Sequence, residues 1–439
     1  MHAGNLSQLL IGHARLLAET NDHLTNLVAS LRVKFSSVDF FHGRITPDTT
    51  ILKDRINNGR RTKPLYHYHA NRVRLPTESC RRTPDQTAAQ EANAVSTSSR
   101  KKTGVLLIQL GTPDSPSIPD VAKYLGEFLN DRRVIDIPWL ARRLLVNGII
   151  VPFRSPKSAK IYKKLWDQSG GASPLLTHTQ KLKRRLQERF EEDDVFIHVG
   201  MRYQNPSMTT VLEDMRQAHY DRIILLPLFP QYASASSGSA IEKALSIIGG
   251  WWVIPEIAVI SQFYDEQAYI EAVVDRAKDY PTDQYDHVLF SYHGLPERHV
   301  DKVYDGSGLC TDQPCENELN ALNRFCYKAT CYATSRLIAR QLGLTESQYT
   351  VCFQSRLNSK WIQPFSDKIV EEWARKGAKK LLVFSPAFVA DCLETVIEIG
   401  EEYQDIFVKH GGRTVQLVPS SNDHPRFVDC LEKLVRDRL

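Results

Sequence analysis

Residues 105–113, which read VLLIQLGTP, and residues 287–296, which read HVLFSYHGLP, decide the fold that this sequence predicts. Each stretch contains a continuous run of mostly apolar residues, without regular alternation, that stops at glycine and proline. Such runs are typical of strands in a parallel sheet, because helices cover both faces of that sheet and every side chain is buried. The two stretches therefore predict the leading strands of two parallel sheets.

Three further strands of the same kind are expected in each half of the chain, with longer amphipathic segments between them. They are residues 196–199, 222–228 and 252–260 in the first half, and 349–353, 380–384 and 414–418 in the second. We predict an α/β protein with two similar Rossmann-like domains, each a four-stranded parallel sheet flanked by helices. The predicted domains are residues 101–268 and 269–439. Ligands of such folds bind beyond the carboxyl ends of the strands, so functional residues are expected there.

The composition is that of an ordinary globular protein, but its charge is unevenly distributed. Of the 439 residues, 42% are hydrophobic and 24% are charged, which excludes collagen-like, coiled-coil and wholly disordered classes. The net charge is +5, yet residues 1–100 hold 14 Lys and Arg against 8 Asp and Glu, and residues 101–439 hold 42 against 43. The nearly neutral main part gives no support to nucleic-acid binding. No apolar run reaches about 18 residues, so no transmembrane helix is expected.

Residues 1–100 differ in composition and charge from the rest and are expected to lie outside the folded part. Leucines at loose helical spacing occupy residues 6–33, and a polar, basic stretch ending in Thr, Ser, Ala and Gln follows. A secretory signal is disfavoured, because no compact apolar segment precedes a small-residue cleavage site. We predict a disordered extension, or one that is not native because translation starts later, for example at Val95. An organelle transit peptide is the alternative.

A histidine follows directly from the second leading strand. His293 comes after the buried run and is followed at once by Gly294 and Pro296, which fix a turn and hold the imidazole at the sheet edge. An imidazole near its reference pKa of about 6.5 can accept a proton or bind a metal. The alternative is a hydrogen-bonded histidine of the core.

Acidic residues follow the strand predicted at residues 380–384, spaced as on one helix face. They are Asp391, Glu394, Glu398 and either Glu401 or Glu402. A charged stripe is usually a solvated helix face, and that interpretation stays open. Carboxylates in a row raise one another's pKa values, so a stripe that begins at a strand end suits a proton relay or a path for a divalent cation.

The strand ends of the first half carry Gly111, Arg202 and the segment 227–232, and a glycine-rich turn lies at residues 170–175. A single glycine-rich turn is a weak signal for phosphate binding. No G-x-G-x-x-G or Walker pattern follows a strand, so a nucleotide cofactor is not expected.

At this point the sequence closely resembles the ferrochelatase family, whose members insert ferrous iron into a porphyrin. The resemblance covers about residues 103–435 and rests on several motifs in the family's order. These motifs are QLGTP at 109–113, YLGEFL at 124–129 with RVI at 133–135, PQY at 230–232, SYHGLP at 291–296, FQSR at 353–356 and DCLET at 391–395. It implies the chelatase fold, protoporphyrin IX and Fe²⁺ as substrates, and the last step of haem biosynthesis.

The resemblance also implies roles for individual residues. His293 is the base that takes the pyrrole protons, and Glu394 faces it across the cleft; both are expected to contact the metal. Asp391, Glu398 and Glu402 form the relay for protons or iron. Bending the flat ring requires a wall of side chains. The residues implied for the porphyrin pocket are Leu110, Tyr162, Ser173, Arg202, Tyr232, Trp361 and Phe388.

Residues 132–164 hold nine Lys and Arg and a single acid, Asp136, with apolar residues between them. This pattern is typical of a surface that lies on a membrane. In the family this region forms the lip of the porphyrin pocket, so we expect a cytoplasmic protein, peripheral at the inner membrane. The alternative is an amphipathic helix that packs on its own sheet.

Four of the eight cysteines lie close together in sequence, at Cys310, Cys315, Cys326 and Cys331. Their C-x4-C-x10-C-x4-C spacing departs from the C-x2-C pairs of zinc ribbons. Four thiolates can hold a [2Fe–2S] cluster, and some bacterial ferrochelatases carry one on internal cysteines. The resemblance leaves open that Cys331 only packs in the core. Cys392 stands where some members have histidine and is not expected to be essential.

Two other functions stay open: another tetrapyrrole metal chelatase, or a two-domain protein that only carries haem or metal. The expected partners are protoporphyrin IX, ferrous iron, the inner-membrane surface and neighbouring enzymes of the haem pathway. No nucleic acid is expected among them.

Overall fold

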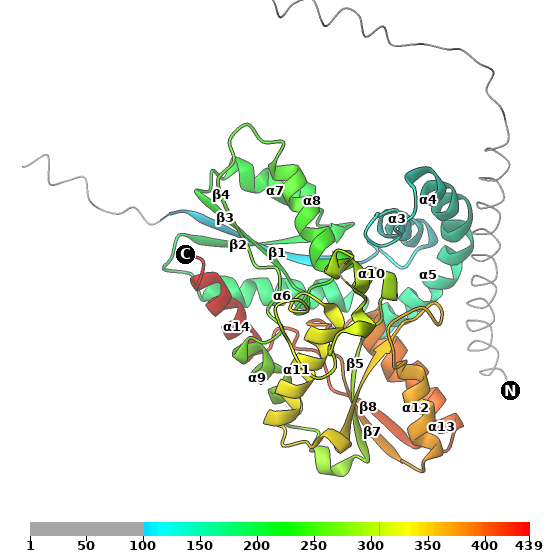
Figure 1. The fold of residues 1–439 in the computed structure, drawn as a ribbon. Coiled ribbons are helices and arrows are strands. Elements are labelled where there is room, and N and C mark those ends of the chain that lie inside the picture. Colours follow the sequence, from blue (N-terminus) through cyan, green and yellow to red (C-terminus); the bar gives the residue numbers. More distant parts are fainter. Residues whose placement is uncertain (1–100, 307) are drawn as a thin grey trace, which may run out of the picture. The chain divides into compact units, whose positions relative to one another are not determined.

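A computed structural model of the protein describes residues 101–306 and 308–439 (Figure 1). The predictions for residues 1–100 lie outside these described residues. The described part contains two four-stranded sheets, and every pair of neighbouring strands is parallel. The prediction of an α/β fold with two parallel sheets flanked by helices is confirmed.

The first sheet has the order β2-β1-β3-β4. Its strands are β1 (Thr103–Gly111), β2 (Val195–Tyr203), β3 (Arg222–Pro227) and β4 (Glu256–Val259). The strand predicted at residues 252–260 begins only at Glu256, because Trp252, Val253 and Ile254 are exposed. The prediction was wrong there because an apolar run need not be buried.

The second sheet repeats this topology, with the order β6-β5-β7-β8. Its strands are β5 (His287–His293), β6 (Tyr349–Gln354), β7 (Lys380–Phe384) and β8 (Thr414–Leu417). In each sheet the leading strand of the predicted set, β1 or β5, is central, so its carboxyl end lies between those of two neighbours. These central strand ends are where the fold allows a ligand site.

Helices connect consecutive strands and cover both sheets. From β1 to β5 they are α3 (Ile118–Leu129), α4 (Trp139–Leu145), η1 (Val146–Ile150), α5 (Val151–Gln168), α6 (Pro174–Glu188), α7 (Met208–Gln217), η2 (Ser234–Gly238), α8 (Ser239–Ile248), α9 (Gln267–Arg276) and η3 (Thr282–Gln284). After β5 they are α10 (Glu297–Asp301), η4 (Lys302–Tyr304), η5 (Cys310–Asp312), α11 (Tyr327–Gln341), η6 (Glu346–Gln348), α12 (Ser366–Arg375), η7 (Glu394–Tyr403), α13 (Gln404–Lys409) and α14 (Pro425–Arg436).

One apolar cluster contains side chains from both sheets. Alternate residues of a strand point to opposite faces, and Val105 and Leu107 of β1 belong to the same cluster as Val288 and Phe290 of β5. The other face of β1 packs under α7 and α8, and the other face of β5 packs under α12 and α13. The two sheets therefore turn one face each toward a shared core.

The last helix, α14, belongs to this shared core through Phe427, Leu431 and Val435. It also reaches the first half of the chain, because Arg436 pairs with Asp193 at 3.1 Å. The chain thus ends against the half in which its described part begins.

The predicted division near residue 268 falls within α9, and we retain it as a proposal for the domain boundary. Among the described residues, no helix is both long enough and apolar enough to cross a membrane.

Candidate active site

His293 is the last residue of β5 and is half-buried. Its Nδ1 atom lies 2.6 Å from the backbone oxygen of Gly294. A carbonyl oxygen can only accept, so Nδ1 carries the hydrogen and Nε2 keeps its lone pair. The local backbone thus holds the imidazole in the form that can accept a proton or bind a metal.

Gly294 allows the close packing behind this histidine. Its N–H donates to the backbone oxygen of Gln354 at 2.8 Å. A Cβ atom at this position would lie 2.8 Å from that same oxygen and 3.2 Å from the ring of Trp361. A side chain therefore cannot be added here without moving the neighbouring strand end.

Two predicted pocket residues flank the imidazole. The ring centroids of Trp361 and Phe388 each lie 6.4 Å from that of His293. Trp361 is fixed by a bridge to Pro296, and Phe388 lies in the turn after β7. The structure therefore places two aromatic rings near His293, and their role in a porphyrin pocket stays a prediction.

Glu394, Glu398 and Glu402 lie on a π-helix instead of the α-helix that their spacing suggested, and Asp391 lies before it. Residues Glu394–Tyr403 form η7, in which hydrogen bonds run from residue i to i+5. Glu394, Glu398 and Glu402 follow one another at intervals of four along this wider helix. Such π-helical segments are rare and are frequent at functional sites.

Glu398 is the most constrained member of this series. Its carboxylate accepts hydrogen bonds from the Ser355 backbone N–H at 2.8 Å, the Ser355 hydroxyl at 2.6 Å and the Gln354 amide at 3.1 Å. Burial raises the pKa of Glu398, while the contact with Ser355 and the nearby His293 act in the opposite direction. Glu394 raises it further. Glu398 therefore interacts electrostatically with both residues proposed for the chemistry.

Glu402 lies at the outer end of the series. The residue as a whole is exposed, yet its carboxyl group lies in a region crowded with protein atoms. The resulting loss of hydration raises its pKa to about 7, and the neighbouring carboxylates of Glu398 and Glu401 contribute in the same direction. A group with this pKa exchanges protons readily near neutral pH.

Asp391 lies before η7, and its carboxylate is engaged elsewhere. It accepts hydrogen bonds from the Asn422 amide at 2.7 Å, the Ser420 N–H at 3.1 Å and the Thr395 hydroxyl at 3.2 Å. These contacts join the loop after β7 to the loop after β8. They favour an anchoring role over the relay role that the sequence suggested, because both of its oxygens are already used.

Tyr162 of α5 lies on the other wall, near Glu394. Burial raises the pKa of its hydroxyl, and the charge of Glu394 raises it further. Its ring packs edge-on against Tyr124 and Trp166, at centroid distances of 6.1 and 5.6 Å. Leu110, at the end of β1, packs against the same group of residues around α3 and α5.

Arg202 and Ser173 have partners of their own. Arg202 donates to Asp131 at 2.5 Å and to Ser239 at 2.7 Å, so its charge is already paired. The Ser173 hydroxyl bonds to that of Thr112 at 3.2 Å. Both residues lie near the strand ends of the first sheet, but Arg202 is not a free anchor for an anion.

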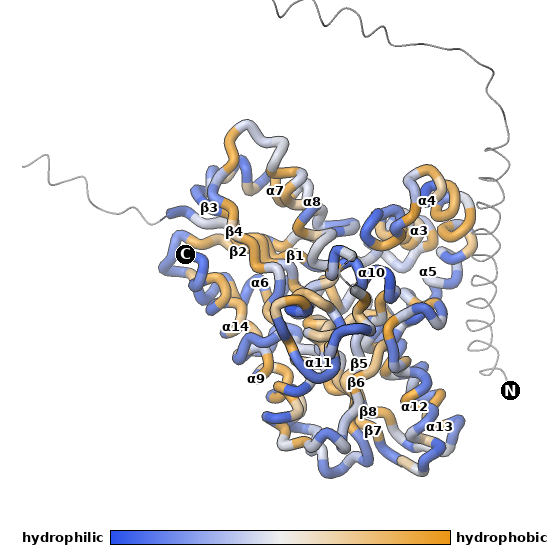
Figure 2. Tube along the Cα trace, in the orientation of Figure 1, coloured by the Kyte–Doolittle hydropathy of each residue, from blue (hydrophilic) through white to orange (hydrophobic). Residues whose placement is uncertain are grey.

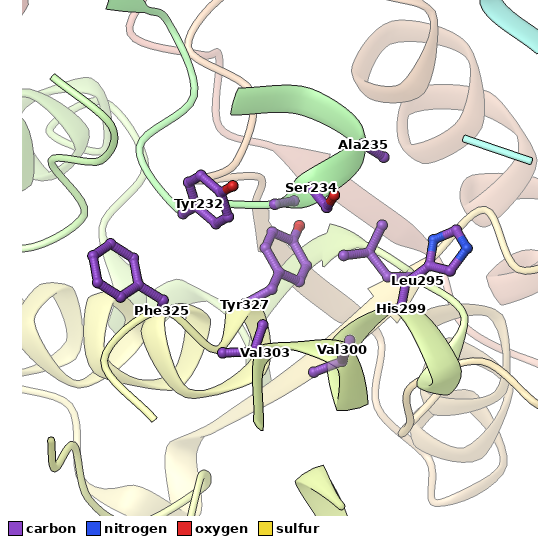
Figure 3. A pocket seen from close by; sticks show the side chains of 10 residues that line it. Tyr232, Ser234, Ala235, Leu295, His299, Val300, Val303, Phe325 and Tyr327 are labelled. Atoms are coloured by element: carbon purple, nitrogen blue, oxygen red, sulfur yellow. The ribbon is translucent and has the colours of Figure 1, made fainter. Parts of the chain in front are cut away.

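Tyr232 lines a small pocket, partly open to solvent, at the junction of the two halves. Figure 3 shows Tyr232 and Ser234 on one side and Leu295, His299 and Val300 on the other. Leu295, which follows His293 by two residues, belongs both to this pocket and to the turn after the histidine.

Three of the four clustered cysteines come together. The sulfur atoms of Cys310, Cys315 and Cys326 lie 3.6 to 3.9 Å apart and are buried. Hydrogen bonds from the other two thiols lower the pKa of the Cys315 thiol, with further help from Tyr304, whose hydroxyl lies 3.2 Å away. A low thiol pKa favours metal binding.

Cys331 is not a member of this group. It lies inside α11, fully buried, and burial raises the pKa of its thiol well above the usual value. The prediction that all four cysteines form one set is therefore not met, and its open alternative of core packing fits Cys331. A [2Fe–2S] cluster takes four ligands, so the three sulfurs fit such a cluster only with a fourth ligand from elsewhere.

Sequence reasoning named no role for Gln354, Ser355 or Tyr124. Gln354 and Ser355 follow β6 directly, so the rule that ligands bind at strand ends could have identified them. Tyr124 gave no such signal, because its contact with Tyr162 arises only when α3 and α5 pack.

His293, the carboxyl groups of η7 and the aromatic rings near them thus lie beyond the carboxyl ends of parallel strands, where a metal and a flat ligand can bind in such a fold. The ferrochelatase family model matches residues 102–439. A ferrochelatase of Legionella pneumophila strain Corby is 46% identical over 337 residues, which are 76% of this chain and 99% of that protein. One of Coxiella burnetii strain CbuK_Q154 is 42% identical over 354 residues, 80% of this chain and 98% of that protein. The chain belongs to the ferrochelatase family, as its motifs predicted.

Solved structures with a related arrangement are more distant. SirB from Bacillus subtilis with Fe³⁺ matches with a TM-score of 0.44 and 12% identity, covering 76% of this chain and 95% of that one. CbiX, described as the terminal enzyme of siroheme biosynthesis in denitrifying bacteria, has a TM-score of 0.41 and 9% identity, with coverage of 76% and 99%.

The raised pKa of Glu402 predicts a pH-dependent stability. In the folded protein the carboxyl group holds its proton up to about pH 7, whereas the unfolded chain loses it near pH 4.5. The folded state binds more protons in this window, so raising the pH through it destabilises the protein. We expect Glu402→Gln to remove this loss, so that the variant gains stability relative to the parent between about pH 5 and 8. Urea denaturation at several pH values measures the difference.

Glu213→Gln is the matched control. Hydrogen bonds from Arg216 lower the pKa of Glu213 in the folded protein. Glu213 is therefore ionised in both the folded and the unfolded state above its unfolded pKa, and its effect on the free energy of unfolding no longer changes with pH there. It should give a constant difference from the parent between pH 5 and 8. Parallel stability curves for the parent and Glu402→Gln over this range would contradict the prediction.

Proposed function

We propose that this protein is a protoporphyrin ferrochelatase. It inserts Fe²⁺ into protoporphyrin IX, forms protohaem and releases two protons, as the last step of haem biosynthesis. The proposal rests on the hydrogen bond from Nδ1 of His293 to the backbone oxygen of Gly294, which leaves Nε2 with a lone pair. The rings of Trp361 and Phe388 lie near this base, in a setting suited to a flat aromatic ring.

The chemistry requires two protons to leave the ring nitrogens as iron enters. His293 accepts these protons one at a time through Nε2, and the resulting imidazolium is stabilised by the nearby carboxylate of Glu398. Burial raises the pKa of Glu398, so it can accept a proton in its turn. Glu402, with a pKa of about 7, passes the proton to water at the outer end of η7.

Glu394 and His293 bind the incoming metal, and Nε2 of His293 is free to accept a proton only after the metal has left it for the ring. A borderline divalent cation such as Fe²⁺ is bound by imidazole and carboxylate ligands. Glu394 begins η7, and the Gln354 amide fixes its position by donating to its backbone oxygen at 3.0 Å. Asp391 supports this arrangement from outside, because it ties the start of the helical segment to the loop after β8.

Ring distortion is assigned to the apolar walls. A planar macrocycle shields its nitrogen lone pairs, so binding energy must be spent on bending it. Trp361 and Phe388 form one wall, and Tyr162 and Leu110 contribute the other. Arg202 and Ser173 hold the strand ends behind this second wall.

Replacing the base tests the function. For His293→Gln we expect kcat/KM for Fe²⁺ and protoporphyrin IX to fall by about 100-fold or more, because the general base is lost. The measurement is loss of porphyrin fluorescence during anaerobic incubation. His410→Gln, at the end of α13, is the control and should keep full activity. A parent protein that binds protoporphyrin without consuming it would indicate a carrier, and one that metallates only a different tetrapyrrole would indicate another chelatase.

We also propose that Cys310, Cys315 and Cys326 supply three of the ligands of an iron–sulfur cluster. Their burial, their short separations and the lowered pKa of the Cys315 thiol support this assignment. Such a cluster would tie η5 to the start of α11 and would take no part in metal insertion.

The iron and sulfide content of cysteine variants tests which cysteines are ligands of the cluster. We expect Cys326→Ser to lose most of the iron, acid-labile sulfide and visible absorbance of the anaerobically purified protein, because it removes one of three clustered thiolates. Cys331→Ser should keep all three signals. A colourless parent protein without sulfide would overturn the cluster, and an equal loss in Cys331→Ser would restore the set of four cysteines.

We further propose that α4 and the start of α5 lie on the surface of the inner membrane. Trp139, Leu140, Leu144 and Phe153 are between 60% and 76% exposed. Figure 2 shows hydrophobic residues in and around α4. The excess of Lys and Arg over residues 132–164 favours an anionic lipid surface.

Binding to vesicles tests this surface. Replacing both Trp139 and Phe153 by Ser should weaken binding to phosphatidylglycerol-containing vesicles by at least roughly tenfold, since a buried aromatic ring contributes about 1.5–3 kcal/mol. Co-sedimentation is the measurement. Trp252→Ser, which changes a fully exposed tryptophan elsewhere, is the control. An equal loss in the control would contradict a contact specific to the lip.

A further inference from the structure

The segment from Asp131 to Asp136 connects α3 to the lip and contacts both halves of the molecule. At its beginning, Asp131 binds Arg202 of β2 at 2.5 Å, and the Arg133 guanidinium donates to Ser234 at 2.8 Å. Both partners belong to the first half. The segment is therefore attached firmly to the sheet from which it comes.

Its other end is attached to the second half. Asp136 accepts hydrogen bonds from Arg298 at 2.5 Å and from Lys302 at 2.6 Å. It also lies 3.1 Å from Nε2 of His299. All three partners come from α10 and the turn that follows it. The cluster of Asp136, Arg298, His299 and Lys302 is called the clasp below.

The clasp differs from an ordinary surface ion pair because its central side chains are buried. The Asp136 side chain is only 14% exposed and that of His299 only 7%, whereas those of Arg298 and Lys302 lie over them in contact with water. Burial alone would raise the pKa of Asp136, but hydrogen bonds from Arg298, Lys302 and His299 outweigh it and keep the pKa far below its usual range. The carboxylate is therefore charged throughout the physiological range.

A buried arginine orients the turn that carries Asp136. The Arg142 guanidinium donates to the backbone oxygens of Ile135 and Ile137, at 3.2 and 3.0 Å. These are the two residues that flank Asp136. Arg142 belongs to α4, so the clasp is coupled directly to the helix that forms the exposed lip.

The other side of the clasp is coupled to the base. Helix α10 begins immediately after Pro296, three residues beyond His293. The backbone there is fixed by hydrogen bonds from Ile362 to Leu295 at 2.9 Å and from Glu297 to Lys360 at 3.0 Å. A displacement of α10 would therefore be transmitted to the turn that holds the imidazole.

From these contacts we propose that Asp136 is a positioning residue that fixes the lip relative to His293. It touches neither the base nor the metal ligands, and it acts by holding α4 and α10 together at the mouth of the pocket. This inference rests on the proposed chelatase function and adds the residue that sets the pocket's width. A porphyrin ring touches both walls, so loss of the clasp weakens its binding before it affects the chemical step.

Hydrogen exchange on the ligand-free protein tests the clasp without any activity measurement. Asp136→Asn keeps the size of the side chain and removes its charge. We expect backbone amides of residues 131–153 to exchange roughly tenfold faster or more, because local opening is no longer opposed by the ionic contacts. Asp136→Glu should recover part of the protection. Asp167→Asn, which breaks the exposed pair with Lys163 on α5, is the matched control and should leave exchange unchanged.

Steady-state kinetics then distinguish positioning from catalysis. For Asp136→Asn we expect the KM for protoporphyrin to rise by about tenfold to a hundredfold with kcat nearly unchanged, because a binding wall has moved. A fall in kcat at constant KM, or unchanged exchange at the lip, would overturn the proposal. If the protein had no chelatase activity at all, the exchange result would still decide whether the clasp exists.

Discussion

The shared apolar core between the two sheets is the constraint on which the site depends. Each sheet turns one face toward this core, so the sheets cannot move independently without exposing side chains such as Leu107 and Phe290 to water. Because the strands within each sheet are parallel, their carboxyl ends are fixed together. This rigidity holds His293 of the second half at a fixed distance from the aromatic side chains of the first, such as Tyr162.

Helix η7 carries the carboxyl groups of Glu394, Glu398 and Glu402, and burying such groups costs free energy. Desolvation disfavours their charged forms, and each carboxylate repels the next. The neighbours of Glu398 show how the cost is reduced: Ser355, Gln354 and Tyr403 all donate hydrogen bonds to it. Glu398 is enclosed by protein, whereas Glu402 is exposed to solvent, so the hydration of the carboxyl groups increases along η7.

The strands, the fold class and the position of His293 could be predicted from sequence because each depends on a local pattern. A continuous apolar run predicts a buried parallel strand, and the histidine directly before Gly294 predicts the end of one. The roles of Asp391 and Cys331 could not be read in this way. Each depends on contacts with residues distant in sequence: Asp391 binds Asn422, and Cys331 is buried in the core shared by the two sheets. The π-helix was missed because spacings of three and four suit an α-helix equally well.

The packing of α14 has a consequence for how the chain is made. This helix follows every strand of both sheets in the sequence, yet it supplies Phe427 and Leu431 to the core that the first sheet needs. Until it emerges from the ribosome, the inward face of β1 lacks part of its cover, although the strands beside it are already synthesised. The first half is therefore made before part of its core exists, and it exposes apolar surface until α14 has been synthesised.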